Sequence, residues 1–482
     1  MNATATTSSD RQVTVRFTKL VWAIVIAGVG LRLCVQILMA GNLNTDPDAY
    51  VQLSQTLAAG NGFSGTGSTT PTAFRPPLFP LLLAIPQWLG ISGTISIATV
   101  QLVASALLLI ATFYLAKLIK LGQVSATIAV ATVACDPLLL VYSSFPMTEV
   151  VAAAFLTWAA VFMLQIRQRL SVVCAESTSI KSVVGVGLFA GCCFGFGGLC
   201  RPILFVACAI SSIVFFLATM FHDLSAMTSF RKNGKVEAMG RGLLKRLMAA
   251  SIPALVAAII LCPWVIRNAV HFEHFIPATT HGGYTLLLGN NPVFYAEVVN
   301  RPDQPRWAGD SLQKWNQLLE NEMQAAGIPQ ADEVRRDHWM YERAKANIAA
   351  DSVSFRRACL LRMKRFGAIV PTAAIEKGTA AKVLIGLFYG IIALGLVVQP
   401  VSDLGGFFYS RDETQPKQFP AWLLWSIVFA FLLMHSVYWT NTRMRAPLTP
   451  LLIALSVVGY RSMGSWCFGY LKWRRDKSVG DC

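Results

Sequence analysis

The stretch KLVWAIVIAGVGLRLCVQILMA, residues 19–40, decides the fold class of this chain. It has the length of roughly 20 apolar residues that a helix needs to cross the hydrocarbon core of a bilayer. It is too long for the apolar part of a secretory signal and lacks a convincing cleavage site, so we expect a retained span. Comparable stretches recur along the 482 residues, of which 54% are hydrophobic and 14% charged. A water-soluble enzyme, with about 25% charged residues, is excluded.

The pattern predicts ten membrane spans, with both termini on one side. After residues 19–40 the expected spans are 96–117, 122–142, 149–166, 183–199, 203–221, 247–266, 382–399, 420–440 and 447–463. Lys and Arg gather at both termini and in the loops after the second, fourth and sixth spans. Since cytosolic loops collect basic residues, we expect a multi-pass protein of the plasma (inner) membrane with both termini in the cytosol. The formal net charge of +16 reports this topology, and no nucleic-acid partner is expected.

Two long segments lie outside the cytosol in this topology. We divide the chain into an N-terminal transmembrane catalytic module 1–266 with a first loop 41–95, an extracytoplasmic loop domain 267–381, C-terminal spans 382–463 and a basic cytosolic tail 464–482. The apolar run 78–89 is too short to cross and predicts a helix lying in the interface. Helical spacing over 332–366 predicts a small extracytoplasmic cap. The glycines of 185–198 lie inside a span, which favours close helix packing over a phosphate loop.

Three carboxylates are expected at one membrane face. Asp46 and Asp48, in Asp46-Pro47-Asp48-Ala49-Tyr50, follow the outer end of the first span, and Glu149 opens the fourth. Such a group suits a general base next to a second acid that orients an acceptor or binds a cation. A solvated acidic loop is the alternative. No cofactor is required by the sequence, and a divalent metal ion held by Asp48 and Glu149 stays open.

Arginines are the natural counter-charges for these acids. The outer segments hold Arg75, Arg201, Arg443 and Arg445. A guanidinium group presents paired donors that match phosphate oxygens, although snorkelling to lipid headgroups explains a single arginine equally well. Arg32 lies inside the first span, where a charge costs roughly 2.5 to 3.5 kcal/mol, so it needs a partner. Asp136 and a lipid phosphate are the two candidates.

The order of the motifs carries a resemblance to a known family. They are Asp46-Pro47-Asp48-Ala49-Tyr50, Arg75-Pro76-Pro77-Leu78-Phe79-Pro80, Met147-Thr148-Glu149, Arg201-Pro202, Pro263-Trp264-Val265-Ile266-Arg267-Asn268, Gly289-Asn290-Asn291-Pro292 and Arg443-Met444-Arg445-Ala446-Pro447. In this order they resemble the GT-C membrane glycosyltransferases, specifically bacterial relatives of the protein O-mannosyltransferases and of the aminoarabinose transferase of lipid A. The resemblance covers most of the chain.

The resemblance implies an all-α bundle of about ten transmembrane helices with extracytoplasmic loops. It also implies an enzyme that moves a sugar, with inversion, from a polyprenyl-phosphate carrier to an extracytoplasmic protein, lipid or cell-envelope glycan. Asp46 then matches the catalytic carboxylate, with Asp48 and Glu149 as accompanying acids and Arg75 on the carrier's phosphate. The further substrate-binding candidates are Tyr50, Arg32, Arg201, Arg443 and Arg445. Because Pro47 separates the acid pair, which aspartate is the base stays open.

A transporter or flippase of lipid-linked saccharides is the strongest alternative. Arg32 and Asp136, two charges within predicted spans, are also what a translocation path presents. A transporter often has paired repeats, and the sequence shows none. The sequence specifies neither the sugar nor the acceptor.

Overall fold

The computed structural model describes residues 8–65, 70–176, 180–230, 236–304, 306–370, 378–409 and 421–480. Among them, eight helices are long and apolar enough to cross a membrane. They are α1 Ser8–Leu38, α5 Gly93–Leu118, α8 Glu149–Glu176, α9 Lys181–Cys200, α10 Ile203–Phe230, α11 Val236–Phe272, α17 Thr379–Tyr409 and α19 Thr449–Gly480. The chain is therefore a multi-pass membrane protein, as its apolar stretches predict.

The two other predicted spans correspond to shorter apolar helices. Residues 122–142 form α6 Gln123–Ala134 and α7 Pro137–Tyr142, and residues 420–440 contain α18 Ala421–Val437. The break before α7 has a local cause, because Pro137 disfavours helical geometry at the residue before it. Asp136 instead caps the new helix, with its carboxylate accepting the Leu139 N–H at 2.8 Å.

Close helix packing explains the glycine-rich run in α9, as predicted. A β-carbon at Gly191 would lie 2.5 Å from the Cβ of Val256 in α11, and one at Gly195 would lie 2.9 Å from the Cβ of Ile260. Small residues at this spacing let the two helix backbones approach, which supplies dispersion contacts where no water drives association.

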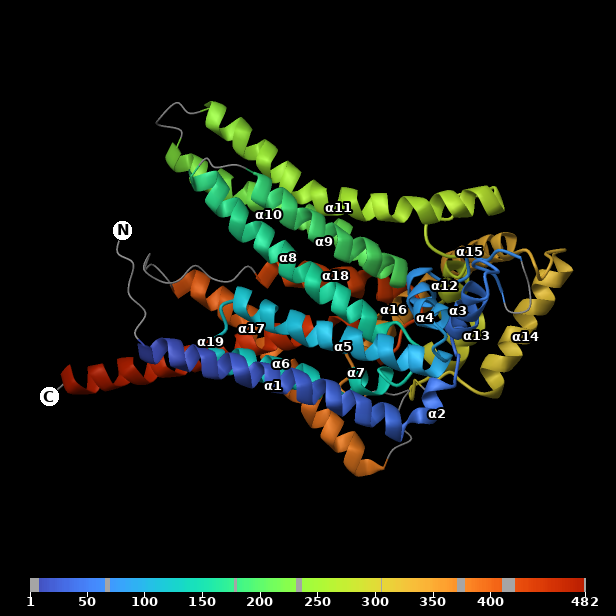
Figure 1. Ribbon diagram of the computed structural model, residues 1–482, viewed down its shortest axis with the longest axis horizontal. Helices are drawn as coiled ribbons and strands as arrows, with labels where there is room; N and C mark the ends of the chain where they lie inside the picture. The colour runs from blue at the N-terminus through green and yellow to red at the C-terminus, as the bar shows by residue number, and fades with distance from the viewer. Residues whose placement is uncertain are drawn as a thin grey trace.

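The loops and short helices gather at one end of the bundle. The first outer segment contains α2 Ala40–Leu43, α3 Tyr50–Ala58 and α4 Leu78–Trp88. Helix α4 corresponds to the short helix expected over 78–89, and its place in the membrane interface stays a prediction. The second contains α12 Gly282–Gly289, α13 Pro292–Phe294, the π-helix η2 Tyr295–Val299, α14 Asp310–Ala325, α15 Glu333–Ala350 and α16 Ser352–Phe366. Figure 1 shows these helices at the right-hand end, whereas α1 begins and α19 ends at the left.

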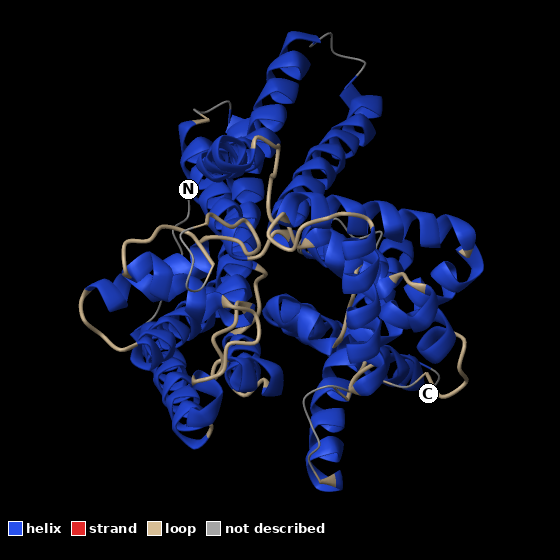
Figure 2. Cartoon of the chain, turned by 90° about the vertical axis from the view of Figure 1, so that its right-hand side faces the viewer, coloured by secondary structure: helices blue, strands red, loops and turns tan. Residues whose placement is uncertain are grey.

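All regular secondary structure among the described residues is helical, apart from one isolated β-bridge between Ser64 and Pro71. Figure 2 looks at the loop-rich end and shows helices joined by loops, without a strand among the described residues. A 3₁₀ helix at this end, η3 Thr442–Leu448, leads into α19. It carries Arg443 and Arg445, so one short element brings both arginines to the loop-rich end.

Candidate active site

The first outer loop turns sharply before α3. Ala49 has a φ of 61°, a left-handed conformation that is uncommon for a residue with a side chain. The Oδ2 atom of Asp46 accepts the N–H of Gln52 at 2.9 Å, in the first turn of α3. A carboxylate at this position is stabilised by the positive end of the helix dipole. Asp46 therefore holds the loop to α3, and the turn directs Asp48 elsewhere.

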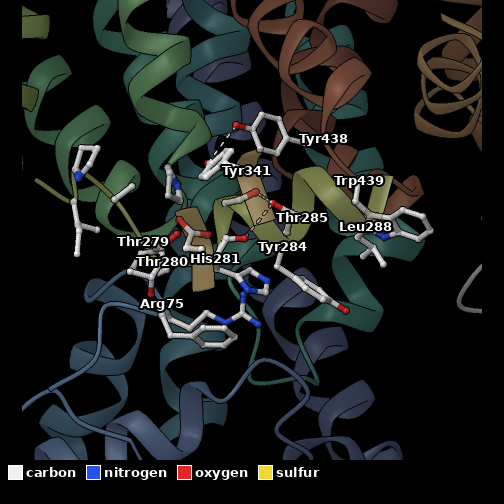
Figure 3. A pocket seen from close by; sticks show the side chains of 18 of the residues that line it. Arg75, Thr279, Thr280, His281, Tyr284, Thr285, Leu288, Tyr341, Tyr438 and Trp439 are labelled. Atoms are coloured by element: carbon white, nitrogen blue, oxygen red, sulfur yellow. Dashed lines mark hydrogen bonds between the residues drawn. The ribbon is translucent and has the colours of Figure 1, made fainter. Parts of the chain in front are cut away.

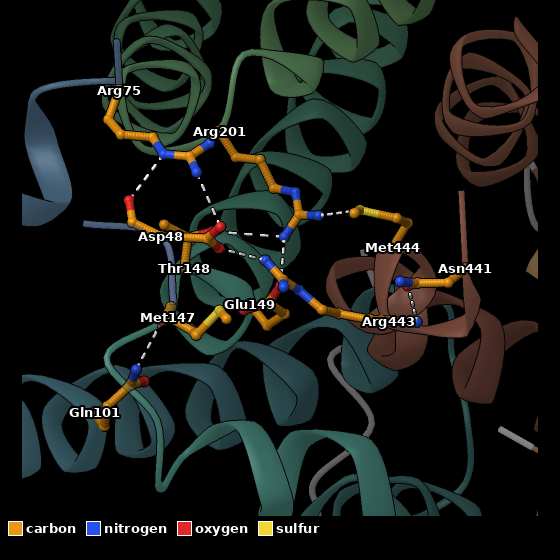
Figure 4. Close-up of polar contacts among 10 residues, drawn as sticks. All are labelled: Asp48, Arg75, Gln101, Met147, Thr148, Glu149, Arg201, Asn441, Arg443 and Met444. Carbon is orange, nitrogen blue, oxygen red and sulfur yellow. Dashed lines mark hydrogen bonds and ion pairs between the residues drawn. The ribbon is translucent and has the colours of Figure 1, made fainter. Parts of the chain in front are cut away.

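Asp48 is held between two arginines from distant segments. Its Oδ1 atom lies 3.0 Å from Nη2 of Arg75, and its Oδ2 atom lies 2.8 Å from Nη2 of Arg443. The Nε of Arg75 also donates to the backbone carbonyl of Asp48 at 2.8 Å. Figure 4 shows the Asp48 carboxylate lying between the two guanidinium groups.

Glu149 is the first residue of α8 and is completely buried. Its Oε1 atom accepts from Nε of Arg443 at 2.5 Å and from Nη1 of Arg201 at 2.9 Å. Its Oε2 atom has no hydrogen-bond partner among the described residues. Arg201 directly follows α9 as its C-cap residue, and its Nη2 donates to the thioether sulfur of Met444, which is a weak acceptor. Arg443 therefore bridges both carboxylates.

The charges in this cluster do not cancel. Arg75, Arg201 and Arg443, here called the arginine cluster, face the two carboxylates of Asp48 and Glu149. Three positive groups meet two negative ones, so one positive charge is left over. Burial raises the pKa of Asp48, but Arg443 and Arg75 outweigh burial and hold that pKa below its ordinary value. Asp48 is therefore ionised near neutral pH, and the cluster can accept one more anion.

A cavity of about 1320 Å³ opens beside the cluster. One end is lined by the first loop and the helix mouths, including Asp48, Tyr50, Arg75, Arg201 and Arg443. The other end is lined by α12, α15 and the segment after α18. Figure 3 shows this second end, with Arg75 below His281 and with Tyr341 and Tyr438 above it. The cavity is large enough to hold a phosphate and sugar rings together.

The remaining predicted residues lie outside this lining. Asp46 is not among the lining residues, although its Oδ1 atom is buried without a hydrogen-bond partner. Arg32 is completely buried, and donates to the carbonyls of Gly28, Ala134 and Val133 at 3.1, 3.0 and 3.1 Å. Two of these carbonyls end α6, where a cation complements the helix dipole. The hydrogen bonds of Arg32 go to these carbonyls and not to Asp136, so its contacts stabilise the α6 end, and a contact with substrate stays a prediction.

Arg445 anchors the helix that carries Arg443. Its Nη1 atom donates to the carbonyls of Phe366 and Ala368 at 3.2 and 2.9 Å, and its guanidinium lies 4.6 Å from the ring centroid of Tyr389. It does not line the cavity. The hydroxyl of Tyr389 in turn donates to Asp136 at 2.9 Å. Arg445 therefore positions η3, and its expected contact with substrate stays a prediction.

The acids do not form a metal-ligand set. Asp48 and Glu149 are both engaged by Arg443, and a guanidinium group between two carboxylates occupies the place that a bridging cation needs. Among the described residues, no group of three or more His, Cys, Asp or Glu is arranged to hold a metal ion. The residues present therefore do not fit a divalent ion as they stand.

The sequence does not point to several residues in the cavity or beside its arginine cluster. Tyr142 lies under the guanidinium of Arg443, with its centroid 5.7 Å away, and Asp337 and Tyr341 line the far end. One signal for that end was available. The pair Gly282-Gly283 marks a place where α15 approaches α12 closely, since β-carbons there would lie 2.0 Å from the Tyr341 hydroxyl and 2.2 Å from the Asp337 carbonyl oxygen.

Comparison with known proteins gives a structural match without a sequence match. No protein-family model and no curated protein matches the chain. The archaeal oligosaccharyltransferase AglB from Archaeoglobus fulgidus, solved in complex with an inhibitory peptide and a dolichol-phosphate, superposes with a TM-score of 0.51 over 95% of this chain, at 15% identity. The chain has a GT-C fold. The predicted all-α GT-C bundle is thereby confirmed, and the chain spans about half of AglB, 52% of its length.

Two further structures are similar. An Archaeoglobus fulgidus oligosaccharyltransferase tethered by a disulfide bond to an acceptor peptide with the NVT sequon has a TM-score of 0.50, with 15% identity over 91% of this chain and 49% of that one. ArnT from Cupriavidus metallidurans, bound to undecaprenyl phosphate, has a TM-score of 0.39 and 12% identity, over 94% of this chain and 78% of that one. The GT-C assignment rests on AglB, and the arginine cluster lies at the loop-rich end of the GT-C fold.

Proposed function

We propose that this chain is a membrane glycosyltransferase that moves a sugar from a polyprenyl-phosphate carrier to an acceptor outside the cytosol. The observation that carries the proposal is the arginine cluster, which has one uncompensated positive charge at the wall of a large cavity. The GT-C fold supports it, because AglB, which has that fold, was solved with a dolichol-phosphate. The basic loops support cytosolic termini in the plasma membrane.

The cluster is suited to a phosphate leaving group. The Nη2 atom of Arg201 donates to the thioether of Met444, a contact that a phosphate oxygen replaces with a stronger charge-assisted bond. As the glycosidic bond breaks, negative charge grows on the phosphate, and preorganised guanidinium groups stabilise that charge. We expect the donor's phosphate to bind Arg75, Arg201 and Arg443 together.

Phosphate binding also frees a carboxylate. In the empty cavity both oxygens of Asp48 pair with arginines, which makes it a weak base. When Arg75 and Arg443 turn to the phosphate, Asp48 regains basicity and can take the proton of the acceptor hydroxyl during in-line attack on the anomeric carbon. Its place in the cavity lining favours Asp48 as the base. Asp46, the match from the family resemblance, is the alternative, and Glu149 orients Arg201 and Arg443.

A second groove is suited to the carrier's tail. It has a volume of about 620 Å³ and a mostly apolar lining that includes Leu81, Leu199 and Trp264. Pro77 and Leu199 line this groove, and the neighbouring Pro76 and Cys200 line the main cavity. An isoprenoid chain in the groove would therefore reach the arginine cluster with its phosphate.

The test is transfer by the full chain reconstituted in liposomes. Undecaprenyl-phosphate hexoses and pentoses labelled in the sugar would be supplied, with membranes from cells that lack the protein as the acceptor source. We expect transfer by the wild type, and loss of at least a hundredfold in Asp48→Asn, since general bases contribute about 10² to 10⁴. Asp303→Asn, at an exposed ion pair, is the matched control.

The outcomes separate the alternatives. Full transfer by folded Asp48→Asn together with loss in Asp46→Asn would assign the base to Asp46. Movement of labelled lipid across the bilayer without a new glycosidic bond would favour a transporter or flippase over the proposed transferase.

A further inference from the structure

The end of the cavity away from the arginine cluster has its own polar lining. We call it the cap end and define it by Thr280, His281, Asp337, Tyr341 and Tyr438. Thr280 is 5% exposed, and its hydroxyl has no hydrogen-bond partner among the described residues. A buried hydroxyl without a partner costs about 1 to 3 kcal/mol, so the site gains when a ligand supplies one.

Asp337 is fixed with one oxygen toward the protein. Its Oδ1 atom accepts the N–H of Gly283 at 2.7 Å, at the start of α12. Its Oδ2 atom has no partner among the described residues, and therefore can accept a hydrogen bond from a ligand. The glycine is required for this contact, because a β-carbon at Gly283 would lie 2.9 Å from Oδ1.

Two tyrosine hydroxyls complete the polar lining. The hydroxyls of Tyr341 and Tyr438 lie 3.5 Å apart, a long and weak contact that two ligand hydroxyls could replace. Figure 3 shows this pair above His281 and Thr280, and all four residues line the same cavity. Four side chains from three segments, namely the residues before α12, helix α15 and the residues after α18, thus present hydroxyl or carboxylate oxygens to one volume.

Aromatic rings form the wall between the two ends. The His281 ring packs against Phe74, with centroids 4.6 Å apart, and stacks on Tyr284 at 5.2 Å. Arg75 lies over the same Phe74 ring at 4.6 Å, so the wall runs from the arginine cluster to the cap end. Burial, with a contribution from Arg75, lowers the pKa of His281 to about 3. The ring is therefore neutral and offers an uncharged face.

We propose that the cap end binds the acceptor, and that this acceptor is a saccharide. The proposal rests on the proposed glycosyltransferase function. Sugar rings carry neighbouring hydroxyls that pair with a carboxylate and with Thr or Tyr hydroxyls, and their C–H faces pack on aromatic rings. Those are the groups that Asp337, Tyr341 and His281 supply. An extended peptide instead needs a row of backbone partners, as a sheet edge provides, and the described lining contains no strand.

Geometry assigns this end to the acceptor instead of the donor. The donor's phosphate belongs to the arginine cluster, and its tail belongs to the apolar groove beside it. The residues of the cap end come from α15, from the segment directly before α12 and from the segment after α18, and both helices lie in the loop-rich region beyond the spans (Figure 1). An acceptor held there would approach the anomeric carbon from the side opposite the phosphate, as in-line attack requires.

The test uses the full chain in detergent micelles and methyl glycosides of glucose, galactose, mannose and arabinose as probes. Saturation-transfer NMR reports binding of each probe. We expect at least one glycoside to bind, with affinity reduced about tenfold or more in Asp337→Asn and Tyr341→Phe, because each change weakens a hydrogen bond to the ligand. Both variants keep the side-chain shape. Asp303→Asn and Tyr114→Phe, which lie outside the cavity, are the controls.

Competition separates this inference from the proposed function. Undecaprenyl phosphate binding without any glycoside binding would overturn the saccharide acceptor and leave the proposed transferase standing. Displacement of the glycoside by undecaprenyl-phosphate sugar, but not by bare undecaprenyl phosphate, would assign the cap end to the donor's sugar and overturn the acceptor assignment. Binding of a glycoside together with either lipid, lost in the two cap-end variants, is the result we expect.

Discussion

Replacing Arg443 by Gln should destabilise the protein more than the loss of an ordinary surface charge. Arg443 bridges Asp48 and Glu149, whose side chains are 19% and 0% exposed, and is itself 21% exposed. Removing one member of a buried ion pair costs roughly 3 to 5 kcal/mol. Because Asp48 keeps Arg75 and Glu149 keeps Arg201, we expect the lower end, about 3 kcal/mol.

The assay is unfolding by SDS titration in mixed micelles. Arg301→Gln is the matched control, since its ion pair with Asp303 is 56% exposed on both sides and should contribute less than about 1 kcal/mol. In a double-mutant cycle, Arg443→Gln combined with Glu149→Gln should cost at least about 1 kcal/mol less than the sum of the two single changes, because the two side chains contact each other directly.

Two results would refute this reasoning. One is an Arg443→Gln protein that unfolds with the same free energy as Arg301→Gln. The other is strict additivity in the double variant, which would mean that Arg443 and Glu149 do not interact in the folded protein.

Three further predictions follow from single contacts. Arg32→Met should lower the free energy of unfolding by about 2 to 4 kcal/mol, because three backbone carbonyls lose a charged hydrogen-bond partner. The affinity of the folded variant for the polyprenyl-phosphate sugar should stay unchanged, and weaker binding of that lipid would show that Arg32 contacts substrate. Gly283→Ala should destabilise the protein by about 1 to 3 kcal/mol, because the added methyl group would overpack on Asp337. Gly30→Ala, which has open space around it, should not destabilise the protein. Equal unfolding curves for the two variants would contradict the close approach of α15 to α12 at Gly283. Burial raises the pKa of Asp337 to about 6, so glycoside affinity should rise from pH 5 to pH 7 as the carboxylate ionises. The pH profile of Asp337→Asn should lack that rise, although Glu333 and His338, whose charges act on Asp337, are unchanged in the variant. Identical pH profiles for the wild type and the variant would exclude this role of Asp337.

The membrane fold follows from the sequence because its signals are local. Apolar length alone predicts the spans, and the glycine-rich run predicts that α9 packs closely on a neighbouring helix, which in the structure is α11. The short run 78–89 predicts α4 for the same reason, since twelve apolar residues cannot cross a bilayer. These predictions needed no knowledge of which helices are neighbours.

The sequence does not predict the break between α6 and α7, because two local signals compete. The apolar residues around Asp136-Pro137 favour one continuous span, and the capping geometry of Asp136 interrupts it. That break also releases the carbonyls that Arg32 binds. The need of Arg32 for a partner could be predicted, but a backbone partner on another helix could not.

The acids and arginines were predicted to share one membrane face, and the pairing among them depends on tertiary structure. Arg443 contacts residues 294 and 395 positions earlier in the chain. No spacing rule links such distant residues. The cap end was unpredictable for the same reason, because Asp337 and Tyr438 come together only when α15 and the segment after α18 pack on α12.

The most direct measurement of the central claim is an electron cryo-microscopy structure of the full chain in nanodiscs with undecaprenyl phosphate. The account predicts the phosphate within hydrogen-bond distance of the guanidinium groups of Arg75, Arg201 and Arg443, with Asp48 released from at least one of them. A phosphate bound elsewhere, with both ion pairs of Asp48 intact, would contradict it.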